Sequence, residues 1–386
     1  MIGFSRWVFA RVTASSGEDA GWLPHDEDTT TMARCCFLHV GAPKTGSTSI
    51  QDALFHDLAD GRLQYVGGGA ANGSFAVNSV FDPPPENEWT FHAVGHEGRF
   101  EDWRDQCARQ FDGELERARS RHAHLVISAE SMWSASREGQ KNLRRRLAEE
   151  QVDIRVIAYL RPWIPWGTSM LQEAVKGGRK VLAIGHSRDR DVFEVRKRLQ
   201  TLFDVFGRER VTVGLYDPCR CVVRDFFARI GAVLPHDRQW KVNERLSLEA
   251  LKLLFAFNRF AGPVGEWGPP RPQGMPRLIA RLQQVPGPGL TLHSSFLRPW
   301  VAEREIDNEW IEREVGFSLS SEAAERDTEN AVATEADLFR YPEATRDWLA
   351  RQVDAPVIRL AEGTDAARAV ADQVDQLRRR DPSPVA

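Results

Sequence analysis

The segment 35–58 constrains the fold more than any other part of the chain. A short, mostly apolar run at 35–40 leads through a turn with Gly41 and Gly46 into a helical pattern that begins at Ser47. This pattern places Ile50, Ala53, Leu54 and Leu58 on one face of a helix. A buried strand that runs straight into a helix is the opening of a β–α–β unit. The segment therefore predicts an α/β protein.

Four further apolar runs resemble buried strands, at 65–66, 125–128, 154–160 and 211–215. Helical patterns lie among them, one from about residue 165 and one whose apolar stripe is Val192, Val195, Leu199, Leu202 and Phe206. The alternation predicts a parallel sheet flanked by helices. Patterns at 247–260 and beyond 296 predict additional C-terminal helices.

Three stretches lack a clear period. Residues 67–87 are rich in Gly, Asn, Ser and Pro and are expected to form a loop over the sheet, and glycine and proline at 262–289 indicate an excursion outside the core. Residues 1–14 resemble a weak signal peptide, but Arg6 and Arg11 interrupt its apolar run. An acidic, Thr-rich stretch at 26–31 follows, so we expect residues 1–32 to form a disordered extension, with Met32 as a candidate initiator. The expected organisation is an extension at 1–32, an α/β core at 33–260 and a helical part at 261–386 packed on the same domain.

The composition excludes several function classes. With 386 residues and a net charge of −4, the chain gives no global electrostatic argument for binding nucleic acid. The five cysteines show no zinc-binding spacing, so no metal is expected, and they are interpreted as reduced core thiols of a cytoplasmic protein. No apolar run is long enough to span a membrane.

The turn in HVGAPKTGSTSIQ, residues 39–51, has the features of an anion site. Backbone N–H groups of residues 45–48 would converge at a helix N-terminus, with hydroxyls from Ser47 and Thr48 beside them. The spacing approaches the nucleotide kinase pattern G-x-x-x-x-G-K-[ST], but the lysine is Lys44, inside the loop. The neighbouring strand ends in Ser-Ala-Glu and offers no aspartate for magnesium. A P-loop small-molecule kinase and a non-catalytic nucleotide-binding protein of the same fold remain the alternatives to the function inferred below.

Two motifs carry a family resemblance. Pro43-Lys44-Thr45-Gly46-Ser47-Thr48 resembles the 5′-phosphosulfate loop of sulfotransferases that use 3′-phosphoadenosine 5′-phosphosulfate (PAPS). Arg161 after a strand, with Ser169 eight residues later, is similar to the pair that binds the 3′-phosphate in that family. The resemblance implies the P-loop-like sulfotransferase fold, PAPS as donor, adenosine 3′,5′-bisphosphate (PAP) as product, and no metal.

The likeness extends to a bacterial branch whose acceptors are carbohydrate-like or uncharacterised. Segments 127–131, 206–218, 222–232 and 243–254 look like that branch, so the resemblance covers roughly residues 33–260. Gly214 departs from it, because an arginine or another polar residue is expected there. The implied reaction moves a sulfuryl group to a hydroxyl or amine of a carbohydrate or small metabolite.

The resemblance also implies roles for single residues. Lys44 would stabilise the charge that develops on the leaving group, and it would hold the 5′-phosphosulfate together with Thr45, Gly46, Ser47 and Thr48. Arg161 and Ser169 would bind the 3′-phosphate.

The general base is less constrained by the sequence. Glu130, just beyond a strand, and His92, on a segment expected to cross the top of the sheet, are the two candidates. His96, His56 and Glu173 are weaker ones. Trp163 and Trp166 flank the arginine motif and are expected in the core rather than stacked on a ligand.

Overall fold

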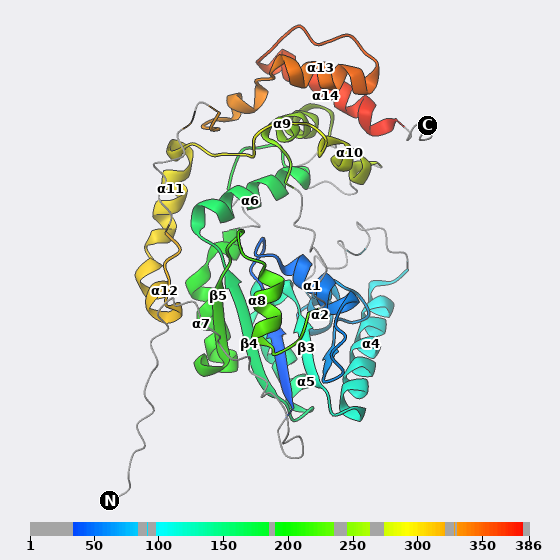
Figure 1. Ribbon diagram of the computed structural model, residues 1–386, viewed down its shortest axis with the longest axis vertical. Coiled ribbons are helices and arrows are strands. Elements are labelled where there is room, and N and C mark those ends of the chain that lie inside the picture. Colours follow the sequence, from blue (N-terminus) through cyan, green and yellow to red (C-terminus); the bar gives the residue numbers. More distant parts are fainter. Residues whose placement is uncertain are drawn as a thin grey trace, which may run out of the picture.

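A five-stranded parallel sheet forms the centre of the molecule (Figure 1). The computed structural model describes residues 34–83, 91, 98–184, 190–234, 245–262, 274–320, 328 and 330–380. The strands are β1 (Cys35–His39), β2 (Leu63–Tyr65), β3 (His124–Ser128), β4 (Asp153–Leu160) and β5 (Val211–Leu215), in the order β2-β3-β1-β4-β5. Every neighbouring pair is parallel. The predicted α/β class is confirmed, and all five expected strands are present.

Helices cover both faces of the sheet. Alternate strand residues such as Phe37 and Ile157 pack with α1 (Ser47–His56) and α8 (Val222–Arg229) in one apolar cluster. The residues between them, such as Leu38 and Val156, belong to the opposite cluster. That cluster includes residues of α4 (Phe100–Ser120), α5 (Arg137–Ala148) and α7 (Val195–Phe206). Because both faces are buried, the strands are continuous apolar runs rather than alternating ones.

Two expectations about irregular stretches are wrong. Within 67–87, residues Ser74–Phe81 form helix α2, which buries Ala76, Val77 and Phe81. Within 262–289, residues Met275–Leu282 form helix α10, which buries Met275, Leu278 and Leu282 in the main core. Each helix has only eight residues, so its apolar face is too short to be distinguished from the surrounding Gly, Pro and Asn, and packing stabilises it. Residues 84–87 and 263–273 lie outside the described residues.

Helix α6 (Trp163–Lys176) follows β4 and begins two residues earlier than expected, after Pro162. The helix expected at 247–260 is α9 (Leu248–Ala256), continued by a π-helical turn at Phe257–Ala261. Asn258 in this turn donates hydrogen bonds from Nδ2 to the carbonyls of Val175 (2.7 Å) and Arg179 (3.2 Å), so it ties the turn to the C-terminal end of α6.

The remaining helices are α11 (Ser294–Glu305), α12 (Asn308–Val315), α13 (Glu343–Val353) and α14 (Thr364–Arg379). Short 3₁₀ turns occupy Glu130–Trp133, Arg190–Phe193, Arg208–Arg210 and Glu335–Phe339. In Figure 1, α9, α10, α13 and α14 gather at the end of the molecule beyond α6. No helix in the described ranges is long and apolar enough to cross a membrane.

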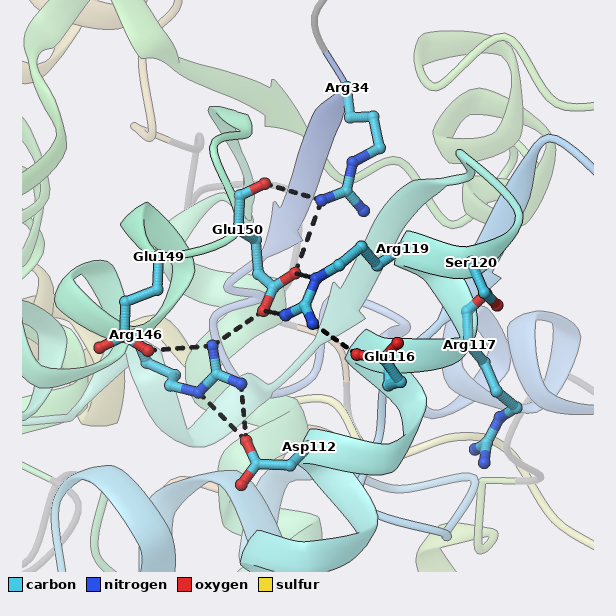
Figure 2. Close-up of polar contacts among 9 residues, drawn as sticks. All are labelled: Arg34, Asp112, Glu116, Arg117, Arg119, Ser120, Arg146, Glu149 and Glu150. Atoms are coloured by element: carbon cyan, nitrogen blue, oxygen red, sulfur yellow. Dashed lines mark hydrogen bonds and ion pairs between the residues drawn. The ribbon is translucent and has the colours of Figure 1, made fainter.

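A charge network joins elements at the amino-terminal ends of β1 and β4 (Figure 2). The buried carboxylate of Glu150 accepts hydrogen bonds from Arg119 Nη2 (2.7 Å) and Arg146 Nη1 (3.0 Å). Arg34 donates to the Glu150 carbonyl oxygen at 2.7 Å. The network links the entry to β1 with α4 and α5, at the edge of the sheet opposite the loops described next.

Candidate anion-binding site

A pocket of about 700 Å³ lies beyond the carboxyl ends of β1, β4 and β5. Four segments line it: the β1–α1 loop with the first turn of α1, Arg161 after β4 together with α6, the β5–α8 turn with the first turn of α8, and Arg245 before α9. Ligands of open parallel sheets bind at this edge. The lining residues are Lys44, Gly46, Ser49, Arg161, Ser169, Gln172, Glu173, Lys176, Tyr216, Pro218, Cys219, Arg220, Cys221, Val222, Val223, Arg224 and Arg245.

The β1–α1 loop presents the N-terminus of α1 to this region. Helix α1 begins at Ser47, and no side chain caps this end, so its first N–H groups have no partner within the helix. Gly46 has φ 86°, and a Cβ there would lie 2.6 Å from Cγ1 of Val222, the first residue of α8 after the β5–α8 turn. Only glycine therefore allows the loop to take this conformation against that turn.

Thr45, Ser47 and Thr48 were all expected to hold a bound anion, but the structure places their hydroxyl groups in different surroundings. Thr45 Oγ1 is buried and donates to the carbonyl of Ala42 at 2.6 Å, so it shapes the loop from inside. Ser47 is buried beside Glu130. Thr48 is exposed and does not line the pocket, whereas Ser49, which the sequence argument missed, does. Helix geometry decides this, because only one side of the first turn faces the pocket.

Arg161 is the most unusual residue of the site. It is only 4% exposed, and its Nη1 donates to the Lys44 carbonyl at 3.0 Å, which ties the loop to the end of β4. Within the described residues, Arg161 Nε is buried without a hydrogen-bond partner and no carboxylate forms an ion pair with the guanidinium. Burial lowers the pKa of Arg161 to about 10, Tyr216 opposes this shift and Arg245 adds to it. A buried cation without a counter-ion is costly unless an anion binds it.

The Lys44 ammonium contacts an acid on α6. Lys44 Nζ lies 2.7 Å from Glu173 Oε2, and the glutamate side chain is about half exposed, at 48%. Lys44 also has a left-handed backbone, with φ 66°. The ion pair holds the lysine side chain against the pocket wall. Lys44 and Glu173 are 129 positions apart in the sequence, and only the fold brings them together.

Glu130 lies directly after β3, in the 3₁₀ turn Glu130–Trp133. Its backbone N–H donates to Ser74 Oγ at 2.9 Å, so the unexpected helix α2 positions it. Burial raises the pKa of the Glu130 carboxyl, the Ser47 hydroxyl and Lys44 oppose the rise, and Glu173 adds to it. A raised pKa brings a carboxylate toward the range in which it can exchange protons near neutral pH.

The remaining residues singled out in the sequence lie in different places: some at the pocket, some in the core and some away from both. Ser169 lines the pocket with Arg161, whereas His56 is exposed at the C-terminal end of α1, away from the loop. Trp163 and Trp166 are buried and stacked on one another with ring centroids 5.9 Å apart, so their placement in the core is confirmed. His92 and His96 lie outside the described residues.

The pocket is strongly cationic although the chain as a whole is acidic. Besides Lys44 and Arg161, its lining includes four further cations: Lys176, Arg220, Arg224 and Arg245. Glu173 is the one acid in this lining. Concentrated positive charge of this kind suits a ligand with several negative charges. No local motif marks these four residues: Lys176 ends α6, Arg220 lies in the β5–α8 turn, Arg224 is on α8 and Arg245 precedes α9, and only the fold brings them to one pocket.

Gly214 has a structural explanation. A Cβ at this position would lie 2.8 Å from the ring of Tyr159 on the neighbouring strand β4. The bulky tyrosine on β4 therefore leaves no room for the side chain that the resemblance leads one to expect. Among the described residues, no group of three or more His, Cys, Asp or Glu side chains is arranged to hold a metal ion.

Comparisons with known proteins yield only remote similarity. No protein-family model matches the chain, and no curated protein matches it. A solved sulfotransferase from Alicyclobacillus acidocaldarius is similar over 59% of this chain and 93% of its own, with 19% sequence identity and a TM-score of 0.35. A structure from the PezAT toxin–antitoxin system of Streptococcus pneumoniae is similar over 48% of this chain and 70% of its own, with 12% identity and a TM-score of 0.29. Likenesses this remote establish neither family nor activity.

Proposed function

We propose that this protein is a PAPS-dependent sulfotransferase, which moves a sulfuryl group from PAPS to a hydroxyl or amine of a carbohydrate or small metabolite. The observation that carries the proposal is the buried guanidinium of Arg161, which lines a cationic pocket without a carboxylate partner among the described residues. Nucleotides with a 3′-phosphate and a 5′-phosphosulfate supply the several negative charges that such a pocket lacks.

Each part of the donor has a candidate partner in the pocket. The planar fork of Arg161, with the Ser169 hydroxyl on the same wall, suits a phosphate group. The uncapped N-terminus of α1 and the Lys44 ammonium suit the 5′-phosphosulfate. The buried hydroxyls of Thr45 and Ser47 shape this loop, and Gly46 lets it pass the β5–α8 turn. We infer no contact for the exposed Thr48 side chain, although its backbone N–H belongs to the first turn of α1.

The transfer is an in-line displacement at sulfur. The acceptor oxygen or nitrogen forms a bond to sulfur, the bond from sulfur to the bridging oxygen breaks, and PAP leaves with the electron pair of that bond. Lys44 would stabilise the charge on the leaving oxygen, which requires it to release Glu173. Glu130 lies beside the Ser47 hydroxyl and near Lys44, outside the pocket lining itself, and from there it would accept the proton of the acceptor.

Nucleotide binding by calorimetry tests the proposal. PAP is expected to bind at least tenfold more tightly than AMP, since a charge-assisted contact to the 3′-phosphate is worth about 1.5–3 kcal/mol. Arg161→Gln should reduce this preference, whereas Arg313→Gln on α12, an exposed arginine outside the pocket lining, should leave it unchanged.

Two results would contradict the assignment. Equal affinity for PAP and AMP would remove the 3′-phosphate from the site. Tighter binding of ATP with magnesium than of PAP would favour the small-molecule kinase.

A further inference from the structure

Two of the five cysteines differ from the rest. Cys219 and Cys221 are exposed and line the cationic pocket, whereas Cys36 and Cys107 are buried and Cys35 is half-buried. The expectation that the cysteines are core thiols is therefore wrong for this pair. The two lie on either side of Arg220, in the turn between β5 and α8.

The turn that presents these thiols is held by hydrogen bonds. The backbone N–H of Cys219 donates to Asp217 Oδ1 at 2.8 Å, and the Cys221 carbonyl accepts from the N–H of Asp225 at 3.1 Å. Cys221 is the N-cap residue of α8, and the next residue, Val222, faces Gly46 of the β1–α1 loop. The backbone of both cysteines is thus held at the wall of the pocket next to the loop.

The positive charges around Cys219 and Cys221 favour some reagents over others. Arg220 lies between the two cysteines, and Arg224 and Arg245 line the same pocket. A cleft whose charges are predominantly of one sign, as here with six cations and one acid in the described lining, concentrates small ions of the opposite sign and raises their rate of encounter by about 10–10³-fold at low ionic strength. Small anions that can react with a thiol are therefore favoured over neutral or cationic ones.

We propose that Cys219 and Cys221 form a thiol–disulfide exchange site whose substrate is a small anionic disulfide of the glutathione disulfide class. The thiolate of one cysteine attacks one sulfur of the disulfide, the disulfide bond breaks, and one glutathione leaves as its thiolate. The product is a mixed disulfide on the pocket wall, which a free thiol reverses by the same exchange. The attached group fills part of the pocket and prevents other anions from binding.

Reaction rates with two disulfide reagents test the site. The dianion 5,5′-dithiobis(2-nitrobenzoate) should react with this protein at least tenfold faster at low salt than at high salt. The uncharged reagent 4,4′-dithiodipyridine should show little salt dependence. Peptide mapping after treatment with glutathione disulfide should place the adduct on Cys219 or Cys221.

Matched variants separate the pocket from general effects. Cys219→Ser with Cys221→Ser should abolish the fast reaction, while Cys107→Ser, which changes a buried thiol, should retain it. Arg220→Gln with Arg224→Gln should weaken the preference for the anionic reagent, and Arg313→Gln on α12 should not. A salt-independent rate with the dianion, or an adduct that maps to another cysteine, would overturn the proposal. These measurements need neither PAPS nor transfer activity, so they remain decisive even if the proposed function is wrong.

Discussion

Lys44 combines an unusual backbone with a charged side chain that already has a partner. Its left-handed φ of 66° and its ion pair with Glu173 place the ammonium at the pocket wall. The half-exposed glutamate can be displaced at low cost, because surface ion pairs are worth about 0–1 kcal/mol. A bound anion can therefore replace Glu173 as the ion-pair partner of Lys44.

Lys44→Ala is expected to reduce the turnover number of sulfuryl transfer by about 10²–10³-fold, because the lost donor acts on charge that appears in the transition state. PAP affinity should change much less, since the leaving group is already formed in PAP. Alanine suffers the same left-handed strain as lysine, so the loop should persist. Steady-state kinetics and calorimetry check the two halves of the prediction.

The matched control for Lys44 is Lys141→Ala on α5, which removes a half-exposed lysine that lies outside the pocket lining. It should leave turnover unchanged. An unaltered turnover number in Lys44→Ala would exclude this lysine from the mechanism.

Glu130→Gln should retain the fold and PAP binding but lose about 10²–10⁴-fold in transfer rate, the usual contribution of a general base. Burial raises the folded-state pKa of Glu130, so the charged form is destabilising and its removal should not lower stability near neutral pH. In the unmodified enzyme, kcat/KM should rise with pH, and the apparent pKa of this rising limb should lie above the ordinary glutamate pKa of about 4.3. This rising limb should vanish in the variant.

His92→Gln provides the comparison for Glu130. An inactive His92→Gln beside a fully active Glu130→Gln would assign the base to the histidine. If both variants stay active, the acceptor needs no strong base, and the assignment of Glu130 is wrong.

Glu150 links the start of β1 with helices α4 and α5, at the edge of the sheet opposite the pocket. Burial acts to raise the pKa of this carboxyl, but hydrogen bonds from Arg119 and Arg146 hold it below its ordinary value. Because the pKa of Glu150 is lowered in the folded state, the network contributes its full stabilisation of the fold at pH values above the ordinary glutamate pKa of about 4.3. The stabilisation is lost as the pH falls through the lowered value.

Glu150→Gln should lower the free energy of unfolding by about 1–3 kcal/mol at pH 7, because arginines that bonded a carboxylate then face an amide. Urea unfolding measures the change. The loss should shrink when the experiment is repeated well below pH 4. Glu149→Gln is the control, since that side chain is 69% exposed and pairs with the same Arg146 at 3.3 Å. Equal losses in the two variants would show that burial of the carboxylate has no special role.

Across the whole molecule, one apolar cluster runs from β1 to α14. It contains Cys36 and Leu38 of the sheet, Leu171 of α6, Leu253 of α9 and Leu377 of α14. This continuity supports the proposal that residues 261–386 pack on the same domain as 33–260, although the boundary itself stays a prediction. Asn258 adds a polar link from the π-helical turn to the end of α6, whose other residues form one wall of the pocket.

The sequence by itself determined the strand–turn–helix at β1 and α1, the parallel sheet, and the position of Arg161 directly after β4. The strand–turn–helix and the arginine position are local, since the apolar period and the glycines of one segment specify them, and the parallel sheet follows from the alternation of such segments along the chain. The long helices α4 and α5 were not predicted, because their polar faces mask a narrow apolar stripe.

Only the tertiary structure decided which residues share the pocket. It brought Glu173 to Lys44 and carried Arg220, Arg224, Cys219 and Cys221 to the same edge of the sheet. The physical reason is that a site at the ends of parallel strands is assembled from loops that are distant in the chain. Their convergence depends on strand order and helix packing, and no local pattern of residues encodes it.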